Sequence, residues 1–476
     1  MRKVLLSLLL WTFSYSVGAK AQSICPTNAA SDKMVCVIPQ LYGPGGLTPS
    51  GGALLDNGHQ GHFGQSFLTN LTPLNSAVGS QLTLLPLASP ASGIIYSYNP
   101  TTGVLSASTE SYGPILSERA ATVGRHKFYA GFSYQHFDFE TLDGVSLNNL
   151  PAVYTHINDS RDVPGRTCSI TSDNTGACAF VRDVIATTNS VDLKLNQFTV
   201  FFTFGITSHF DVSIAIPIVS ISMRATSRNT IIPNSTQNLH QFKGPGCPAP
   251  AGPTLPPACG QAAFTNAQNA SGSGDVVLRG KVNVYKGERF GIAIGTDLRL
   301  PTGEELNFLG SGTIGVKPFA VASFQGRVAP HANVALEVNG NSLLAGDISV
   351  RSRGHLPNQF IYSVGADAGV TKWLSAAFDI VGQRVIKARR VSTTTFTDLG
   401  ACKFVPSSPP DCSSPVTHMF PSLLASRDSF NITSASIGLK IRPVGKLLVT
   451  GNVLIKLDEG GLRSRFVPLI GISYTF

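Results

Sequence analysis

Residues 275–286 read DVVLRGKVNVYK, and apolar and polar side chains alternate along them. In an extended segment Val276 and Leu278 fall on one face and Arg279 and Lys281 on the other, because successive side chains of a β-strand point to opposite faces. A face with this much charge needs water, so the apolar face needs a different environment. We therefore predict a strand that separates an aqueous lumen from lipid.

The same pattern recurs from residue 127 to the end of the chain, and the connections between runs alternate between long and tight up to a short last loop. Bacterial outer-membrane barrels have an even strand number, short periplasmic turns and longer outer loops. The long connections are expected at 142–190, 229–272, 304–312, 345–358 and 387–428. The runs cover 127–141, 191–206, 211–228, 273–285, 291–303, 313–327, 332–344, 359–371, 374–386, 429–444, 447–459 and 464–476.

The sequence thus predicts an all-β protein, a transmembrane antiparallel β-barrel of about twelve strands formed by residues 126–476. A tilted strand needs about 9–11 residues to cross the bilayer, and closure of the barrel leaves no main-chain group unpaired in lipid. The alternative is a soluble β-sandwich with long loops, which does not explain the regular alternation of long and tight connections.

The N-terminus indicates export. Arg2 and Lys3 precede an apolar stretch at 4–13, and Ala-Lys-Ala at 19–21 supplies a small-x-small cleavage site. These features predict a secretory signal peptide over residues 1–21, in agreement with a location in the bacterial outer membrane.

Residues 22–125 differ from the rest, because they are rich in Gly, Pro, Ser, Leu and Asn and show weak periodicity. A twelve-strand barrel is wider than the eight-strand kind whose side chains fill the interior. We expect this segment to enter the lumen as a plug, with a short helix around 65–85. A disordered periplasmic leader is the alternative.

The C-terminal strand ends on Phe476, and its aromatic and apolar residues alternate with small ones. A terminal aromatic that closes an amphipathic strand resembles the signal by which outer-membrane barrels engage their assembly machinery. The formal net charge of +9 on 476 residues comes without a clustered basic tract, so nucleic acid is not an expected partner.

The eight cysteines form four close pairs in loop-like segments. Eight cysteines allow 105 connectivities, but local pairing is the economical choice in an exported chain, which folds under oxidising conditions. The spacing does not match a zinc site, and no metal is expected. The expected disulfides are Cys25–Cys36, Cys168–Cys178, Cys247–Cys259 and Cys402–Cys412.

Two runs change the face that carries their apolar residues, one near Asn196 and Gln197 and one near Ser434. Each change predicts a β-bulge, a device that barrels use at rims or near sites. Pro217 lies inside a third run and would cost a ladder hydrogen bond, so we expect a bulge there too.

Several phrases carry a family resemblance: GSGDVVLRGK at 272–281, LPTGEE at 300–305, NFLGSG at 307–312 and DVSIAIP at 211–217. Together they resemble the outer-membrane proteins named for the meta-cleavage pathway of phenol degradation, distant relatives of the FadL-type transporters of fatty acids and aromatic hydrocarbons. The resemblance covers about 200–476. It implies a barrel that takes up small hydrophobic molecules.

The period of two also assigns a set of charged side chains to the lumen. One interpretation is a polar guide for a transported molecule. The other is a ladder of cross-strand ion pairs that props the barrel open and anchors the plug. The set comprises Asp275, Arg279, Lys281, Asp297, Arg299, Lys317, Glu337, Asp367, Asp379, Lys440 and Lys456.

The expected function is therefore passive uptake of small hydrophobic compounds, with aromatic ones among the candidates, and the expected partners are outer-membrane lipid and a small hydrophobic ligand. A general diffusion porin is one alternative. A structural or adhesive barrel with ligand-binding loops is another. The motifs of serine hydrolases, zinc proteases and phosphate-binding loops do not occur in the sequence, so neither enzymatic activity nor a cofactor is expected.

Overall fold

The protein is described by a computed structural model. No helix in the described part of the chain is both long and apolar enough to cross a membrane. The structure describes residues 24–26, 28–44, 46–47, 50–51, 74–83, 85, 96–99, 104–107, 111–155, 183–232, 240–242, 259–403 and 411–476.

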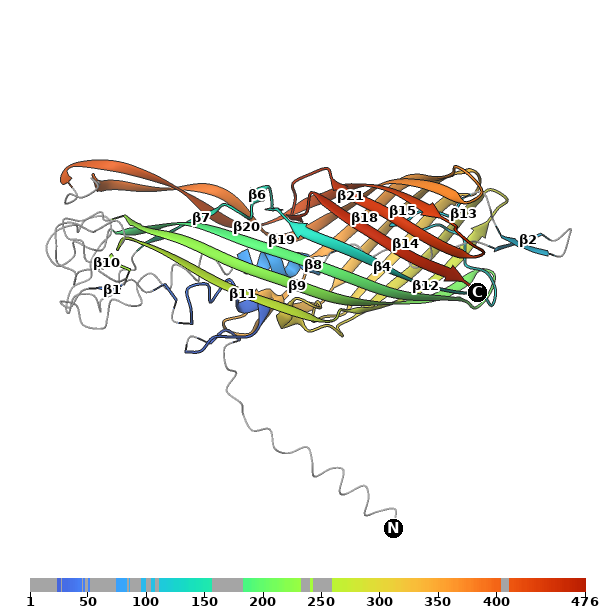
Figure 1. Ribbon diagram of the computed structural model, residues 1–476, viewed down its shortest axis with the longest axis horizontal. Helices are drawn as coiled ribbons and strands as arrows, with labels where there is room; N and C mark the ends of the chain where they lie inside the picture. Colours follow the sequence, from blue (N-terminus) through green and yellow to red (C-terminus); the bar gives the residue numbers. More distant parts are fainter. Residues whose placement is uncertain are drawn as a thin grey trace, which may run out of the picture.

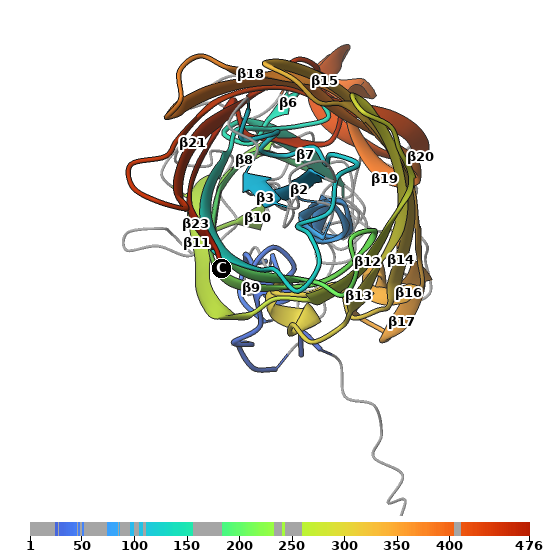
Figure 2. The ribbon, with the colours of Figure 1, turned by 90° about the vertical axis from the view of Figure 1, so that its right-hand side faces the viewer.

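Twelve antiparallel strands form a closed ring (Figure 2), which confirms the predicted fold class. The ring closes because the last strand pairs with the first and because β9 pairs with both β8 and β12. Its strands are β4 (Phe128–Phe139), β8 (Val184–Gly205), β9 (Phe210–Ile232), β12 (Val276–Lys286), β13 (Phe290–Leu300), β14 (Gly315–Phe324), β15 (Val328–Asn339), β18 (Asn358–Gly369), β19 (Leu374–Lys403), β20 (Asp411–Ile441), β21 (Leu447–Lys456) and β23 (Phe466–Thr475).

Smaller elements lie around and within this ring. A helix covers residues 74–82, inside the segment where a helix was expected, and lies within the ring (Figure 2). The others are η1 (Met34–Cys36), η4 (Glu305–Asn307), β1 (Ser50–Gly51), β2 (Tyr96–Asn99), β3 (Val104–Ala107), β5 (Thr141–Leu142), β6 (Val145–Ser146), β7 (Leu150–Thr155), β10 (His240–Gln241), β11 (Gln261–Ser273), β16 (Asn341–Asp347), β17 (Ser352–His355) and β22 (Leu462–Arg463).

The two ends of the barrel differ. Tight turns lie at the end that holds the C-terminus, and long connections lie at the other end (Figure 1). Because short turns of such barrels are periplasmic and long loops extracellular, the end with the C-terminus faces the periplasm. The tight turns span 206–209, 287–289, 325–327, 370–373 and 442–446.

Much of the sequence expected to form outer loops instead continues the strands. β19 and β20 are 30 and 31 residues long and pair with each other far beyond the ring, where a loop was expected at 387–428 (Figure 1). β9 extends in the same way and pairs there with β11. The amphipathic pattern fades beyond the lipid although the hydrogen-bonded ladder continues, so the pattern ends before the strand does.

The bulge predicted near Asn196 and Gln197 is wrong, because the register of β8 with both of its neighbours runs through these residues without a shift. On the periplasmic side Phe198 is 45% exposed and faces outward, whereas on the extracellular side Leu195 is buried and faces inward. The apolar residues change faces because the strand leaves the membrane. Within lipid its outer face is apolar, and above lipid its inner face is.

The bulge predicted at Ser434 is wrong for the same reason. β20 pairs with β19 and β21 in continuous register at this residue. The nearest shift of register in the ladder with β19 lies between Val385 and Ala388. Below Ser434 the side chain of Ile437 is 48% exposed and faces lipid, whereas above it Phe430 is buried inside.

Pro217 is accommodated without a bulge in the ladder between β8 and β9. On its other side β9 pairs with β12 up to Ala215 and with β11 from Ile218 onward. The carbonyl of Pro217 accepts a hydrogen bond from the main-chain N–H of Gly274, at the break between β11 and β12. The absent N–H of proline thus faces a position where the ladder is already interrupted.

Candidate functional site: a charged inner wall and two adjoining cavities

The eleven charged residues assigned to the lumen are all buried or half-buried in the structure, and none is exposed to lipid. Their partners fall into a few clusters, most of which involve residues 111–123. This stretch, called here the inner strap, is a coil that runs around the inside of the ring near its periplasmic end (Figure 2).

The first cluster joins β12, β13 and β14 to the inner strap. The guanidinium of Arg279 donates two hydrogen bonds to Asp297, at 2.6 and 2.7 Å, and a third to Glu118 of the strap. Lys317 Nζ lies 2.9 Å from Asp297 Oδ2, and Lys281 Nζ lies 3.2 Å from Glu118 Oε2. Three cations thus share two carboxylates, and each cation has at least one carboxylate partner, as buried charges require.

A second cluster reaches from β13 to β15 across the inner face of β14. Arg299 lies 3.2 Å from Glu337 and also donates hydrogen bonds to Asn339 and, at 3.4 Å, to the carbonyl of Thr83. Gln359 donates to Glu337 at 3.2 Å. This cluster therefore ties the inner wall to the segment that follows the helix at 74–82.

The third cluster centres on His331. Its Nε2 lies 2.5 Å from Asp379 Oδ1 and its Nδ1 3.4 Å from Asp367 Oδ1. The same two carboxylates accept hydrogen bonds from the strap, Asp367 from Ser111 and Asp379 from Ser117 at 3.0 Å. Two strap hydroxyls and one histidine therefore share a pair of buried aspartates.

Lys440 is a buried cation held by main-chain oxygens of the strap. Its Nζ donates to the carbonyl of Tyr112 at 3.1 Å and to that of Pro114 at 2.6 Å. Farther along, the strap amides of Ala120 and Val123 are also satisfied by barrel side chains. The strap has little secondary structure of its own, so the inner wall satisfies much of its hydrogen bonding.

The remaining two predicted residues lie nearer the extracellular end. Asp275 accepts hydrogen bonds from the amides of Gly303 at 3.1 Å and Ser311 at 2.8 Å, and one from the Ser311 hydroxyl. It thus fixes the connection between β13 and β14. Lys456 lies 2.9 Å from Glu459.

Sequence reasoning did not select Glu118 or His331. Nothing in the aperiodic strap distinguishes Glu118 locally, and its role depends on partners more than 160 residues away. His331 was detectable, because it shares the inward parity of Asn333 and Glu337 on β15 and lay one residue outside the predicted run.

Two adjoining cavities in the lumen are bounded by residues that the structure describes. One, of about 230 Å³, is bordered by the first two charged clusters and by apolar side chains including Leu116, Val277 and Phe319. The other, of about 120 Å³, has a mainly aromatic and aliphatic lining that includes Phe137 and Phe139. Their linings share Leu85, Ile361, Val381 and Gln383, so the two cavities adjoin.

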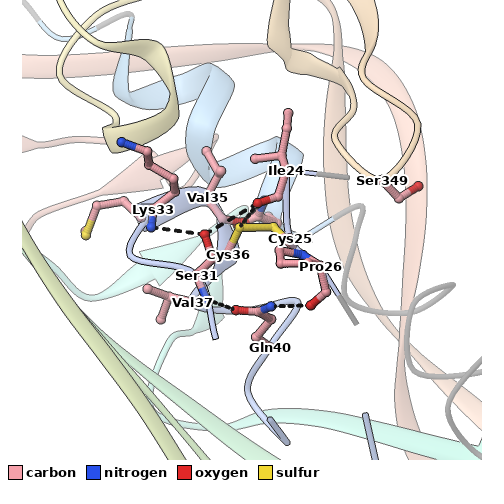
Figure 3. The surroundings of a disulfide bond; sticks show 12 residues. Ile24, Cys25, Pro26, Ser31, Lys33, Val35, Cys36, Val37, Gln40 and Ser349 are labelled. Carbon is pink, nitrogen blue, oxygen red and sulfur yellow. Dashed lines mark hydrogen bonds between the residues drawn. A yellow bond between two sulfur atoms is a disulfide. The ribbon is translucent and has the colours of Figure 1, made fainter. Parts of the chain in front are cut away.

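The first described residues are fastened at the extracellular side. Cys25 and Cys36 are joined by a disulfide, and Gln40 Nε2 donates to the carbonyl of Pro26 at 2.7 Å across the loop (Figure 3). Lys33 Nζ lies 2.7 Å from Glu304 Oε1 in the connection after β13. This hydrogen bond raises the pKa of Lys33 and lowers the pKa of Glu304.

The structure describes only some of the cysteines of the other three predicted disulfides. Cys259 is disulfide-bonded, and its partner lies outside the described residues. Cys168, Cys178 and Cys247 also lie outside them, as do the side chains of Cys402 and Cys412. The expected signal peptide over 1–21 lies outside the described residues as well.

Comparison with known families gives one match. Residues 173–393 match the family described as "Putative MetA-pathway of phenol degradation". Comparison with curated proteins gives no match.

Solved structures with related shapes are outer-membrane proteins of low identity. The COG4313 outer membrane channel from Pseudomonas putida F1 is 13% identical, with a TM-score of 0.40 over 76% of this chain and 99% of that one. A FadL homologue from Pseudomonas aeruginosa is 10% identical, with a TM-score of 0.31 over 81% and 96%. The toluene transporter TbuX from Ralstonia pickettii is 12% identical, with a TM-score of 0.24 over 75% and 92%.

Likeness at this level does not establish a shared activity. The closed ring of twelve strands and the lipid-facing apolar residues stand independently of it. The protein is a β-barrel of the bacterial outer membrane whose residues 173–393 match the family named for the meta pathway of phenol degradation.

Proposed function

We propose that this barrel is a passive channel for small hydrophobic compounds, and that residues 22–125 act as its plug. The observation that carries the proposal is the pair of adjoining cavities in the lumen, one with a mainly apolar lining and the other bordered by the inner strap. A molecule without charge gains free energy by leaving water for such a lining, at about 25 cal/mol per Å² of apolar surface buried.

The inner strap is the barrier on the periplasmic side of this path. Lys440, Arg279 and Lys281 each hold an oxygen of the strap. Most of the lumen charges therefore fit the second of their two interpretations, as anchors for the plug, better than a role in guiding the solute. Passage of a solute requires these contacts to separate and re-form. Thermal fluctuation of the strap is enough for this, so no coupling to an energy source is needed.

Two measurements test the proposal. In a planar bilayer the folded protein should show low conductance with brief openings, whereas steady large conductance would support a general diffusion porin instead. A fluorescent naphthylamine should bind to the purified protein, and Ile361→Asp should weaken that binding at least tenfold because Ile361 lines both cavities. Ser352→Asp, at an exposed extracellular position, is the matched control and should bind as the unmodified protein does.

The C-terminal strand supports a second, separable proposal, that barrel-assembly machinery recognises Phe476. The main-chain N–H of Phe476 donates to the carbonyl of Phe128 at 2.7 Å, and the Phe476 ring, 57% exposed, lies 4.8 Å from that of Tyr474. Phe476→Ala keeps the main-chain bond and removes the ring. It should lower the amount assembled in the outer membrane while leaving the stability of the assembled barrel nearly unchanged. An unchanged yield would contradict the assignment.

A further inference from the structure

The lipid-facing wall between β9 and β18 contains an open groove of about 670 Å³. Its floor is low because the residues there have small side chains or none, namely Gly280, Thr296 and Ala320. Larger apolar side chains border it, namely Phe210, Val282, Ile294, Val334, Leu336 and Phe360. Its apolar lining suits a hydrocarbon chain that lies against the barrel.

The β-sheet register joins this groove to a cationic surface. Leu336 on β15 opposes Phe360 on β18, and Phe360 opposes Arg384 on β19. Both apolar residues border the groove, so its β18 edge is one strand away from Arg384. In β19 the lipid-facing Phe378 is 49% exposed, and Arg384 follows it toward the extracellular side.

Four cations lie on this surface, and none of them forms an ion pair with an acidic residue that the structure describes. Arg384, Lys387 and Arg427 are exposed, and Arg389 is half-buried. Arg389 and Arg427 are direct cross-strand neighbours, an arrangement of like charges that destabilises a sheet. Within the described part of the chain, none of the four forms an ion pair, and Arg389 Nε is buried without a hydrogen-bond partner.

The acidic groups nearby have other partners. Asp428, opposite Ala388, accepts a hydrogen bond from the amide of Ser429 at 2.7 Å. Asp347 accepts two from Ser349, at 2.6 and 2.9 Å. Asp347 is close enough to attract Arg389 electrostatically. Neither carboxylate is within ion-pair distance of Arg389 or Arg427, so among the described residues these two neighbouring cations have no direct ion-pair partner.

We propose that the groove and the four cations form one binding site for a phosphorylated glycolipid of the outer leaflet. An acyl chain lies in the groove, and a phosphate lies on the guanidinium groups of Arg384, Arg389 and Arg427. Guanidinium groups match phosphate oxygens in pairs. A free anion would use only the cations, so the groove beside them selects a lipid. The site is independent of the proposed uptake, because it lies on the outside of the barrel.

The experiment compares binding of diphosphoryl lipid A, dephosphorylated lipid A and inorganic phosphate to delipidated protein in detergent, by native mass spectrometry. Diphosphoryl lipid A should bind at least tenfold more tightly than its dephosphorylated form. Arg389→Gln with Arg427→Gln should lose that preference. Arg289→Gln with Lys372→Gln, which removes the same charge from exposed periplasmic turns, should retain it.

A groove variant separates the lipid from a simple anion. Ala320→Leu fills the floor and should weaken lipid A several-fold while inorganic phosphate binds as before. Heat-modifiable electrophoretic mobility reports whether each variant keeps its barrel. The proposal is overturned if folded Arg389→Gln/Arg427→Gln protein binds diphosphoryl lipid A as well as the unmodified protein, or if Ala320→Leu leaves lipid binding unchanged, which would reduce the site to an anion patch.

Discussion

Replacing Glu118 by Gln should loosen the inner strap and raise the open fraction of the channel. The Glu118 side chain is only 8% exposed and accepts hydrogen bonds from both Arg279 and Lys281. Glutamine is nearly isosteric, so the substitution removes the charge and one acceptor without changing the volume. Of the carboxylates in ion-pair contact with Arg279, Lys281 and Lys317, only that of Asp297 would remain among the described residues.

Breaking a buried ion pair from one side costs about 3–5 kcal/mol. The lower end applies here, because Arg279 keeps its two hydrogen bonds to Asp297 and Lys281 keeps the carbonyls of Arg119 and Ala121. A cost of about 3 kcal/mol corresponds to roughly a hundredfold change in the ratio of closed to open states. The variant should therefore open about a hundred times as often.

Single-channel recording in a planar bilayer measures this ratio directly. Glu459→Gln is the control, because it removes a carboxylate that pairs with Lys456 but is 56% exposed and lies far from the strap in sequence and contacts. Its open fraction should match that of the unmodified protein. An intact barrel in which Glu118→Gln opens no more than twice as often would refute the view that this cluster holds the strap closed.

Three further predictions concern the extracellular side. Cys25→Ser with Cys36→Ser removes a cross-link between residues 11 apart and should cost the local structure about 3 kcal/mol, seen as faster proteolysis of residues 24–42 with unchanged barrel mobility. Asp275→Asn replaces one of two accepting oxygens by a donor, so the amides of Gly303 and Ser311 should exchange hydrogen faster, by about 1–3 kcal/mol of lost protection. The Lys33–Glu304 pair should protect residues 31–37 over about pH 5–10. Its contribution falls at low pH, as Glu304 is protonated through its lowered pKa, and at high pH, as Lys33 loses its proton through its raised pKa. Hydrogen exchange measures it, and Glu304→Gln should abolish the acid-side change.

The places where sequence interpretation went wrong share one cause. Near Asn196 and Ser434 the apolar residues change faces while the ladders continue. The change from lipid to water outside the strand was therefore mistaken for a bulge in the backbone. The same change hid the outer halves of β19 and β20, which were expected to be loop. A period of two reports which face is apolar, and that depends on whether lipid or water lies outside.

The sequence by itself determined the class of fold, the number of spanning strands and the inward direction of charges such as Arg279 and Asp379, because strand alternation is local and repeats every two residues. Only the tertiary structure decided what those charges meet. Lys440 holds the carbonyl of Pro114 across 326 positions of sequence, and Arg279 meets Glu118 across 161. The sequence of the strap has no periodic pattern that could predict such contacts. Its hydrogen-bond partners are side chains of distant strands, and only closure of the ring brings them around the strap.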